Sequence, residues 1–236
     1  MSAKYPNETT KESQYQPMLD IRQRKGLARL GLMSNQVWND DPRRVVFSLS
    51  RYKFVAKMFT GRCNVLEVGC GDAFASRIVK QEVERLTVID FDPVFIADAK
   101  ERLDPDWPME CVVHDIVASP YPGKFDAIYS LDVFEHIRPE SEDRFIQHAI
   151  ISLAPHGVMI IGIPSLESQV HASPQSAAGH VNCKTAAELR KVLSPYFHSI
   201  FMFSMSDEVV HTGFAPMAHY LLAVCADCSV SREPSG

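Results

Sequence analysis

Short apolar segments rich in β-branched residues alternate with helical segments over most of this chain, and this alternation constrains the fold more than any other feature. From residue 64 onward, the β-type runs are 64–69, 86–90, 109–114, 125–131 and 157–164. Stretches with helical patterning lie between or after them at 74–83, 94–103, 141–153 and 185–193. Because the runs are too apolar for burial on one side only, they predict a parallel sheet covered by helices on both faces.

Two further β-rich runs, at 200–205 and 219–226, follow the last helical stretch without a convincing helix between them. They predict an antiparallel pair at one edge of the sheet. The expected fold is α/β and Rossmann-like, with a seven-stranded, mostly parallel sheet, helices on both faces and an antiparallel last strand pair. We expect an N-terminal extension or helical lid over 1–60, the main domain over 61–226 and a flexible tail over 227–236.

The composition disfavours several classes of protein. The 236 residues carry a formal charge of −5, and no run of Lys and Arg is longer than RQRK at 22–25. A nucleic-acid partner normally requires a basic face, so this class is disfavoured. No apolar stretch approaches the roughly 20 residues that cross a bilayer, and the polar N-terminus lacks a hydrophobic leader core. The six scattered cysteines are typical of reduced thiols, so we expect a cytoplasmic protein without membrane contact.

A glycine-rich turn follows the first strand, in the sequence VLEVGCGDAFAS at 65–76. Gly69 and Gly71 lie where the strand turns into a helix, and their missing side chains permit a tight turn and a close approach of the backbone to a ligand. Asp90 ends the next strand, 21 positions after Gly69, where a carboxylate suits ribose hydroxyls. Phe74 replaces the third glycine of a dinucleotide fingerprint, and Glu67 can face a cationic ligand. A positively charged, phosphate-free nucleoside fits this pattern better than a dinucleotide, and the structural alternative is an ordinary strand–helix turn.

The sequence VLEVGCGDA, with VID at 88–90 and HDI at 114–116, resembles the first motifs of the class I S-adenosylmethionine-dependent methyltransferases. The resemblance extends over roughly residues 60–226 and implies S-adenosylmethionine as the cofactor. It implies contacts to the amino-acid part by Gly69, Cys70 and Gly71, to ribose by Asp90, and to adenine by Phe91, Asp115 and Ile116. We also expect Leu131, the last residue of a strand, beside the cofactor. Arg51, in a predicted helix before the sheet, can meet the cofactor's carboxylate or can lie on a solvated helix face.

The strand 125–131 leads into the sequence SLDVFEHI, which brings Asp132, Glu135 and His136 together within five positions. Ligands of parallel sheets lie at the carboxyl ends of the strands, so we expect these groups beside the methyl donor. In a first interpretation His136 is a general base, steered by Glu135, that removes a hydroxyl proton. In a second, the three side chains share one helix face and hold a divalent cation. In a third they are a structural, acid-rich start of a loop or helix.

The D/E-x-x-E-H pattern is similar to that of ubiquinone-pathway O-methyltransferases and of small-RNA 3′-terminal methyltransferases, where it is associated with magnesium. His180 matches a further histidine of the second group, whereas Asp132 stands where a glutamate is usual. The metal therefore stays unknown, with Mg²⁺ as the candidate ion. The long segments 165–182 and 207–219 have little periodicity and are predicted to cover a substrate.

These features together predict an S-adenosylmethionine-dependent methyltransferase that acts on a small polar acceptor. A hydroxyl of a sugar, a sugar nucleotide or a phenolic metabolite is favoured, because a neutral amine needs less help in losing its proton. One alternative is a metal-dependent RNA 3′-end methyltransferase, which the net charge of −5 disfavours. The other is a non-catalytic S-adenosylmethionine-binding protein, which the intact DVFEHI sequence disfavours.

Overall fold

The computed structural model describes residues 8–229 of the chain. The chain divides into two compact units, Met1–Leu30 and Gly31–Gly236. The described part of the first unit holds a 3₁₀ turn, Ser13–Tyr15, and one helix, α1 (Gln16–Lys25), which has no buried residue. The expected boundary at residue 60 falls inside the second unit, because the helices before the first strand pack with the sheet.

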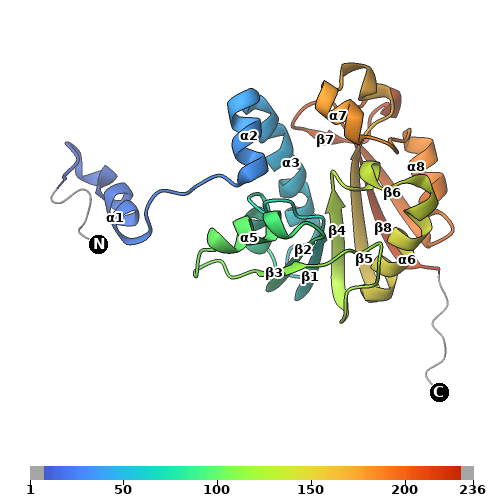
Figure 1. The fold of residues 1–236 in the computed structure, drawn as a ribbon, viewed down its shortest axis with the longest axis horizontal. Coiled ribbons are helices and arrows are strands. Elements are labelled where there is room, and N and C mark those ends of the chain that lie inside the picture. The colour runs from blue at the N-terminus through green and yellow to red at the C-terminus, as the bar shows by residue number, and fades with distance from the viewer. Residues whose placement is uncertain (1–7, 230–236) are drawn as a thin grey trace. The chain divides into compact units, whose positions relative to one another are not determined.

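The second unit is built on one eight-stranded sheet (Figure 1). The strand order is β3-β2-β1-β4-β5-β8-β6-β7. The first five strands of this order run parallel, and β8 is antiparallel to both β5 and β6. The strands are β1 (Asn64–Val68), β2 (Arg85–Asp90), β3 (Glu110–Val113), β4 (Phe125–Leu131), β5 (Leu153–Pro164), β6 (Phe197–Met205), β7 (Val210–His211) and β8 (Tyr220–Cys228). The predicted Rossmann-like sheet with its antiparallel end is confirmed, and the two-residue β7 is the strand that the sequence patterns missed.

Helices cover both faces of this sheet (Figure 1). They are α2 (Leu32–Asp40), α3 (Pro42–Met58), α4 (Ser76–Lys80), α5 (Pro93–Glu101), α6 (Glu142–Ser152), α7 (Pro174–Gly179) and α8 (Ala186–Leu193). Residues of α3, α4 and α5 belong to one buried apolar cluster, and residues of α6 and α8 belong to the other. Neighbouring residues of β1 divide between the clusters, since Val65 lies in the first and Leu66 in the second. Burial on both faces explains why the strand sequences are so apolar.

Local signals explain where several helices begin and end. Asp41 caps α3 by accepting a hydrogen bond from the Arg43 amide at 3.2 Å, and Pro42 occupies the first turn. The helix expected over 74–83 is shorter, because the amide of Glu84 and the carbonyl of Glu82 already pair with the segment that precedes β1. Conversely, the segment 165–182 is not an irregular loop, since it contains a 3₁₀ turn and α7.

The remaining segments differ from expectation at a few points. A tail is expected from residue 227, but β8 extends to Cys228, and residues 230–236 lie outside the described residues. The segment 207–219 holds β7 and a 3₁₀ turn at Ala215–Met217. Within residues 8–229, every helix is too short or too polar to span a membrane.

Candidate active site

The turns that follow β1 and β4 lie side by side at the carboxyl edge of the sheet. The register pairs Glu67 of β1 with Tyr129 of β4, so the two strands end at nearly the same level. Gly69 follows β1, and a Cβ atom added to it would lie 2.3 Å from Cγ2 of Val133. The predicted cofactor turn and the DVFEHI segment are therefore neighbours in space.

The glycine turn has the backbone that only small residues adopt easily. Gly69 and Gly71 have φ angles of +75° and +51°, which lie in the left-handed region that L side chains avoid. The Asp90 carboxylate accepts hydrogen bonds from the amides of Gly71 and Asp92, both at 2.9 Å. Asp90 thus holds the turn in shape, and its carboxylate keeps lone pairs for further donors such as hydroxyls.

The other predicted cofactor residues lie on neighbouring loops of the same edge. The His114 amide donates to the Asp90 carbonyl at 2.9 Å, which brings the ends of β3 and β2 together. Phe91 is 72% exposed, while the Asp115 carboxylate is exposed and accepts from the Val117 amide at 2.8 Å. Ile116, Leu131 and Cys70 are buried. Burial raises the pKa of the Cys70 thiol, so this side chain stays a neutral part of the turn.

Glu67 is enclosed beneath the glycine turn. It is 1% exposed, and its two carboxylate oxygens accept hydrogen bonds from Tyr52 of α3 at 2.9 Å and Tyr129 of β4 at 2.7 Å. Burial raises the pKa of Glu67 to about 7. The two tyrosines were missed by the sequence analysis, although a hydroxyl in each of two apolar segments is the kind of signal that marks a buried acceptor. The described structure thus engages both oxygens within the protein.

Arg51 of α3 also lies at the carboxyl edge of the sheet, where it binds Asp132. Its side chain is 12% exposed, and its Nη1 binds both carboxylate oxygens of Asp132, at 2.5 Å for Oδ1. The guanidinium carbon lies 4.4 Å from the ring centre of Phe47 and 3.8 Å from that of Tyr220. The alternative that Arg51 lies on a solvated helix face is wrong, because aromatic rings and a carboxylate surround it.

Asp132 does not share a helix face with Glu135 and His136. Its φ angle is +57°, and only Phe134–His136 form a single 3₁₀ turn. The Asp132 amide still follows the sheet, donating to the Gly162 carbonyl at 3.0 Å and to the Tyr220 hydroxyl at 3.2 Å. The helical spacing expected for these three residues is therefore wrong, because residue 132 ends the strand in a left-handed conformation and turns its carboxylate toward Arg51.

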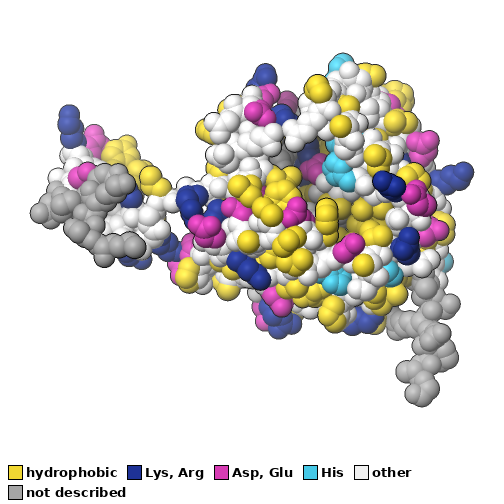
Figure 2. All heavy atoms as spheres, viewed as in Figure 1, with side chains coloured by type: hydrophobic (Ala, Val, Ile, Leu, Met, Phe, Trp, Pro, Cys, Tyr) yellow, Lys and Arg dark blue, Asp and Glu magenta, His cyan; other side chains and the backbone are white. Residues whose placement is uncertain are grey.

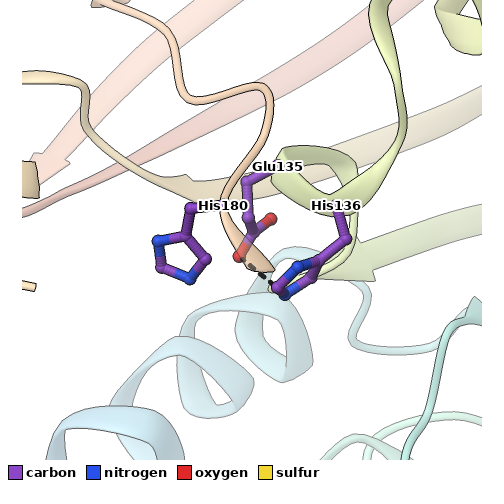
Figure 3. Close-up of side chains that lie close together, drawn as sticks. All are labelled: Glu135, His136 and His180. Atoms are coloured by element: carbon purple, nitrogen blue, oxygen red, sulfur yellow. Dashed lines mark ion pairs between the residues drawn. The ribbon is translucent and has the colours of Figure 1, made fainter. Parts of the chain in front are cut away.

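His180 takes the place next to Glu135 and His136 (Figure 3). The three side chains each offer one ligand atom, and these atoms all lie within 4.8 Å of one another. His136 Nε2 is 3.9 Å from Glu135 Oε1, and the centres of the two imidazole rings are 5.2 Å apart. We call these residues the Glu–His–His cluster. The structure thus brings together three of the four residues that were predicted to act chemically.

Hydrogen bonds fix the tautomers of both histidines. His136 Nδ1 lies 2.8 Å from the Gly179 carbonyl oxygen, and His180 Nδ1 lies 2.8 Å from Gln169 Oε1. Each oxygen can only accept, so each Nδ1 carries the proton and each neutral ring keeps its lone pair on Nε2. Burial, followed by the charge of His136, lowers the pKa of His180 and favours its neutral form.

Glu135 is the buried member of the cluster. It is 1% exposed, and its Oε2 has no hydrogen-bond partner among residues 8–229. Burial, followed by the charge of Asp132, raises the pKa of Glu135 well above its usual range. A buried oxygen without a partner is costly, so a donor or a cation bound there would be stabilised. The cluster therefore offers two unprotonated imidazole nitrogens beside a carboxylate whose Oε2 has no partner among residues 8–229.

Two helices flank the site from opposite sides. Gln36 of α2 donates a hydrogen bond to Gln175 of α7 at 3.1 Å. Figure 2 shows the surface hollowed between these helices, with histidine and acidic side chains at its edges. Gln36, in the helical lid expected over 1–60, thus meets the predicted covering segment 165–182. His171 and His211 lie outside the cluster. The ring centres of His171 and His219 are 6.4 Å apart, and Nδ1 of His211 accepts a hydrogen bond from the Gly213 amide at 2.9 Å.

Known proteins share both the sequence and the fold of this region. Residues 65–157 match the family described as "Methyltransferase domain". The chain is 27% identical over 138 residues to Nodulation protein S of Sinorhizobium fredii, which covers 56% of this chain and 64% of that protein. It is 26% identical over 118 residues to the ubiquinone biosynthesis O-methyltransferase of Xanthomonas campestris, covering 47% and 49%. The matched segment is therefore a methyltransferase domain, and the chain is similar to S-adenosylmethionine-dependent methyltransferases.

Solved methyltransferase structures share the fold at low sequence identity. The N-methyltransferase NodS from Bradyrhizobium japonicum, in complex with S-adenosyl-L-homocysteine, superposes with a TM-score of 0.62 at 20% identity, covering 80% of this chain and 90% of that one. The methyltransferase domain of bacterial CtHen1 gives a TM-score of 0.64 at 16% identity, covering 77% and 98%. In sequence, the match spans about half the length of the curated relatives. The solved structures show that the fold is shared, and the acceptor follows from the residues of this chain.

Proposed function

We propose that this protein transfers a methyl group from S-adenosylmethionine to a hydroxyl of a small polar acceptor. The observation that carries the proposal is the Glu–His–His cluster, with two Nε2 lone pairs beside a partnerless carboxylate oxygen at the end of β4. A sulfonium methyl group is already activated, so the protein has to place the acceptor and accept its proton. A neutral amine acceptor needs little help in losing its proton, whereas a hydroxyl acceptor needs a group such as this cluster to take its proton.

The glycine turn fits the cofactor. Gly69 and Gly71 have φ angles of +75° and +51°, and a Cβ atom at Gly69 would clash with Val133 at 2.3 Å, so the turn keeps its tight shape only with glycine. Asp90 would bind the ribose hydroxyls, and Phe91 with Asp115 would contact adenine. Arg51 would bind the cofactor's carboxylate. When bound, S-adenosylmethionine supplies an electrophilic methyl group on sulfur, and all other tasks fall to residues of the chain.

The cluster performs the proton transfer in this proposal. The acceptor hydroxyl donates to Nε2 of His136 or His180, which takes the proton as oxygen attacks the methyl carbon. The hydrogen bonds from Nδ1 to Gly179 and Gln169 keep Nε2 unprotonated beforehand. Glu135, 3.9 Å from His136, stabilises the imidazolium that forms. Proton removal by the base contributes a factor on the order of 10² to 10⁴ to the reaction rate.

The same three residues are also a donor set for a divalent cation, which is a second way to activate a hydroxyl. Two imidazole nitrogens and one carboxylate oxygen suit a transition-metal ion, whereas Mg²⁺ prefers oxygen ligands. Asp132 would have supplied a second carboxylate, but it pairs with Arg51. The donor set therefore favours a first-row transition-metal ion over the candidate Mg²⁺. Such an ion would lower the pKa of a bound hydroxyl.

The proposal is tested by turnover with a panel of sugar, phenol and amine acceptors, measured as release of S-adenosylhomocysteine. We expect turnover with a hydroxyl acceptor and a loss of roughly 10²-fold or more in kcat for His136→Ala and His180→Ala. His198→Ala is the matched control, because His198 is exposed near the start of β6, at the opposite edge of the sheet. Turnover of amines alone, or full activity in both cluster variants, would refute the hydroxyl proposal. Repeating the assay with EDTA and with added Mn²⁺ separates the base from the metal mechanism.

RNA 3′-end methylation is less well supported. The likeness to the CtHen1 domain concerns the fold, and the net charge of −5 argues against a long phosphate contact. An RNA-binding titration at several salt concentrations would reveal such a partner by a steep loss of affinity with salt.

A further inference from the structure

Arg51 is a fixed cation at the cofactor edge. Its guanidinium lies against the rings of Phe47 and Tyr220, and its side chain is 12% exposed. Its Nε is buried without a hydrogen-bond partner in the described part of the chain. Stacking on two rings holds the plane of a guanidinium and leaves its edge to bind a carboxylate, and here Nη1 binds both carboxylate oxygens of Asp132.

Asp132 is the movable member of this ion pair. Its side chain is 39% exposed, and only its carboxylate contacts Arg51. Its backbone is held in the left-handed region by hydrogen bonds to Gly162 and Tyr220, a conformation that aspartate tolerates better than most residues. Rotation of the side chain alone can therefore release the carboxylate while the backbone stays in place.

Asp132 also lies between the two halves of the proposed site. The next residue, Val133, contacts the space beside Gly69, where the amino-acid part of the cofactor is expected. On the other side, Glu135 and His136 follow Asp132 closely in the chain, in the 3₁₀ turn Phe134–His136. Burial, followed by the charge of Asp132, raises the pKa of Glu135.

We propose that Asp132 competes with the carboxylate of S-adenosylmethionine for Arg51, and that cofactor binding turns Asp132 toward the Glu–His–His cluster. The reason is that the Arg51 side chain is only 12% exposed and its Nη1 is already bound to both carboxylate oxygens of Asp132, so a second carboxylate has to displace the first to take the same position. Once released, Asp132 adds a negative charge and two acceptor oxygens to the cluster. The inference rests on the proposed function and adds an order of events to it: the cofactor binds first, and only then is the acceptor side of the site completed.

The direction in which one substitution changes the affinity for S-adenosylhomocysteine tests the exchange. Asp132→Asn removes the competing charge and keeps a residue that tolerates the left-handed backbone. We expect S-adenosylhomocysteine to bind this variant about 3- to 10-fold more tightly in titration calorimetry, the range of a partly exposed, forked ion pair. 5′-Methylthioadenosine, which lacks the amino-acid part, should bind the variant and the unmodified protein equally. Arg51→Gln should weaken binding of S-adenosylhomocysteine but not of methylthioadenosine, which also shows that the variant is folded.

Two controls make the outcome decisive. Asp126→Asn removes the same charge at the opposite end of β4, where Asp126 accepts from the Asn64 amide at 2.9 Å, and should leave both affinities unchanged. If Asp132→Asn binds S-adenosylhomocysteine as wild type does, or more weakly, Asp132 does not compete and the exchange is refuted while the proposed function stands. If the unmodified protein binds neither ligand, the proposed function fails and the exchange fails with it.

Discussion

Glu67 gives this protein a stability term that depends on pH near neutrality. Its carboxyl is 1% exposed and is bound by Tyr52 and Tyr129, and burial raises its pKa from 4.5 to about 7. The folded protein therefore binds the Glu67 proton more tightly than the unfolded chain does. Its stabilising contribution is complete below pH 4.5 and is lost as the pH rises toward 7. At 1.36 kcal/mol per pKa unit, the loss amounts to about 3 kcal/mol.

The substitution Glu67→Gln isolates this term. Glutamine is neutral at every pH and can accept a hydrogen bond from one tyrosine and donate to the other. The difference in unfolding free energy, Glu67→Gln minus wild type, should rise by about 3 kcal/mol between pH 4.5 and pH 7.5. Groups that titrate elsewhere act on both proteins and cancel in this difference.

Urea denaturation, followed by circular dichroism at half-unit pH steps, measures the difference directly. Glu140→Gln, at an exposed position in the 3₁₀ turn Pro139–Ser141, is the matched control and should show no comparable rise. A difference for Glu67→Gln that stays flat within about 0.5 kcal/mol from pH 5 to pH 8 would refute the reasoning. It would mean that the two tyrosine hydroxyls stabilise the charged carboxylate as fully as water does.

Three smaller changes test the glycine turn, the aromatic core below the site and the start of α8. Gly69→Ala adds a Cβ 2.3 Å from Val133 at a φ of +75°, and should cost about 1–3 kcal/mol and weaken S-adenosylhomocysteine binding in calorimetry. Phe134→Ala removes a fully buried ring, which should lower the unfolding free energy in urea by about 3–5 kcal/mol. Thr185→Ala breaks the capping box with Glu188, and thermal unfolding should show a loss of about 1 kcal/mol.

The fold was predictable because its signals are local and repeated. Each strand of the parallel half is a short apolar run, and each is followed by a segment with helical or turn signals. The glycine turn and Asp90 could be placed as well, since left-handed glycines and a strand-end acid have few other uses. A regular pattern of this kind can be recognised in the sequence without any knowledge of contacts between residues.

The details of the acidic segment were not predictable in the same way. Whether Asp132 joins Glu135 or pairs with Arg51 depends on a φ angle of +57° and on a helix 81 residues earlier in the chain. The spacing D-x-x-E-H is compatible with an α-helix, and the sequence holds no local signal that ends β4 in a left-handed residue instead. His180 lies beside His136 because the carbonyl of the preceding residue, Gly179, accepts the Nδ1 proton of His136. This is a contact between distant segments, which no periodicity of the sequence indicates.

Helix α3 connects the buried carboxylate to the cofactor edge. Tyr52 and Arg51 are consecutive residues, so they point about 100° apart around the helix axis. Tyr52 binds Glu67 in the core, and Arg51 binds Asp132 at the surface of the site. A shift of α3 that relieves an ionised Glu67 therefore also moves the guanidinium that the proposed exchange requires. Glu67→Gln should for this reason reduce any change of S-adenosylhomocysteine affinity between pH 6 and pH 8, whereas affinity for methylthioadenosine, which does not reach Arg51, should be the same in both proteins. Equal pH profiles for S-adenosylhomocysteine in the variant and in a pH-dependent wild type would show that the helix does not transmit the titration.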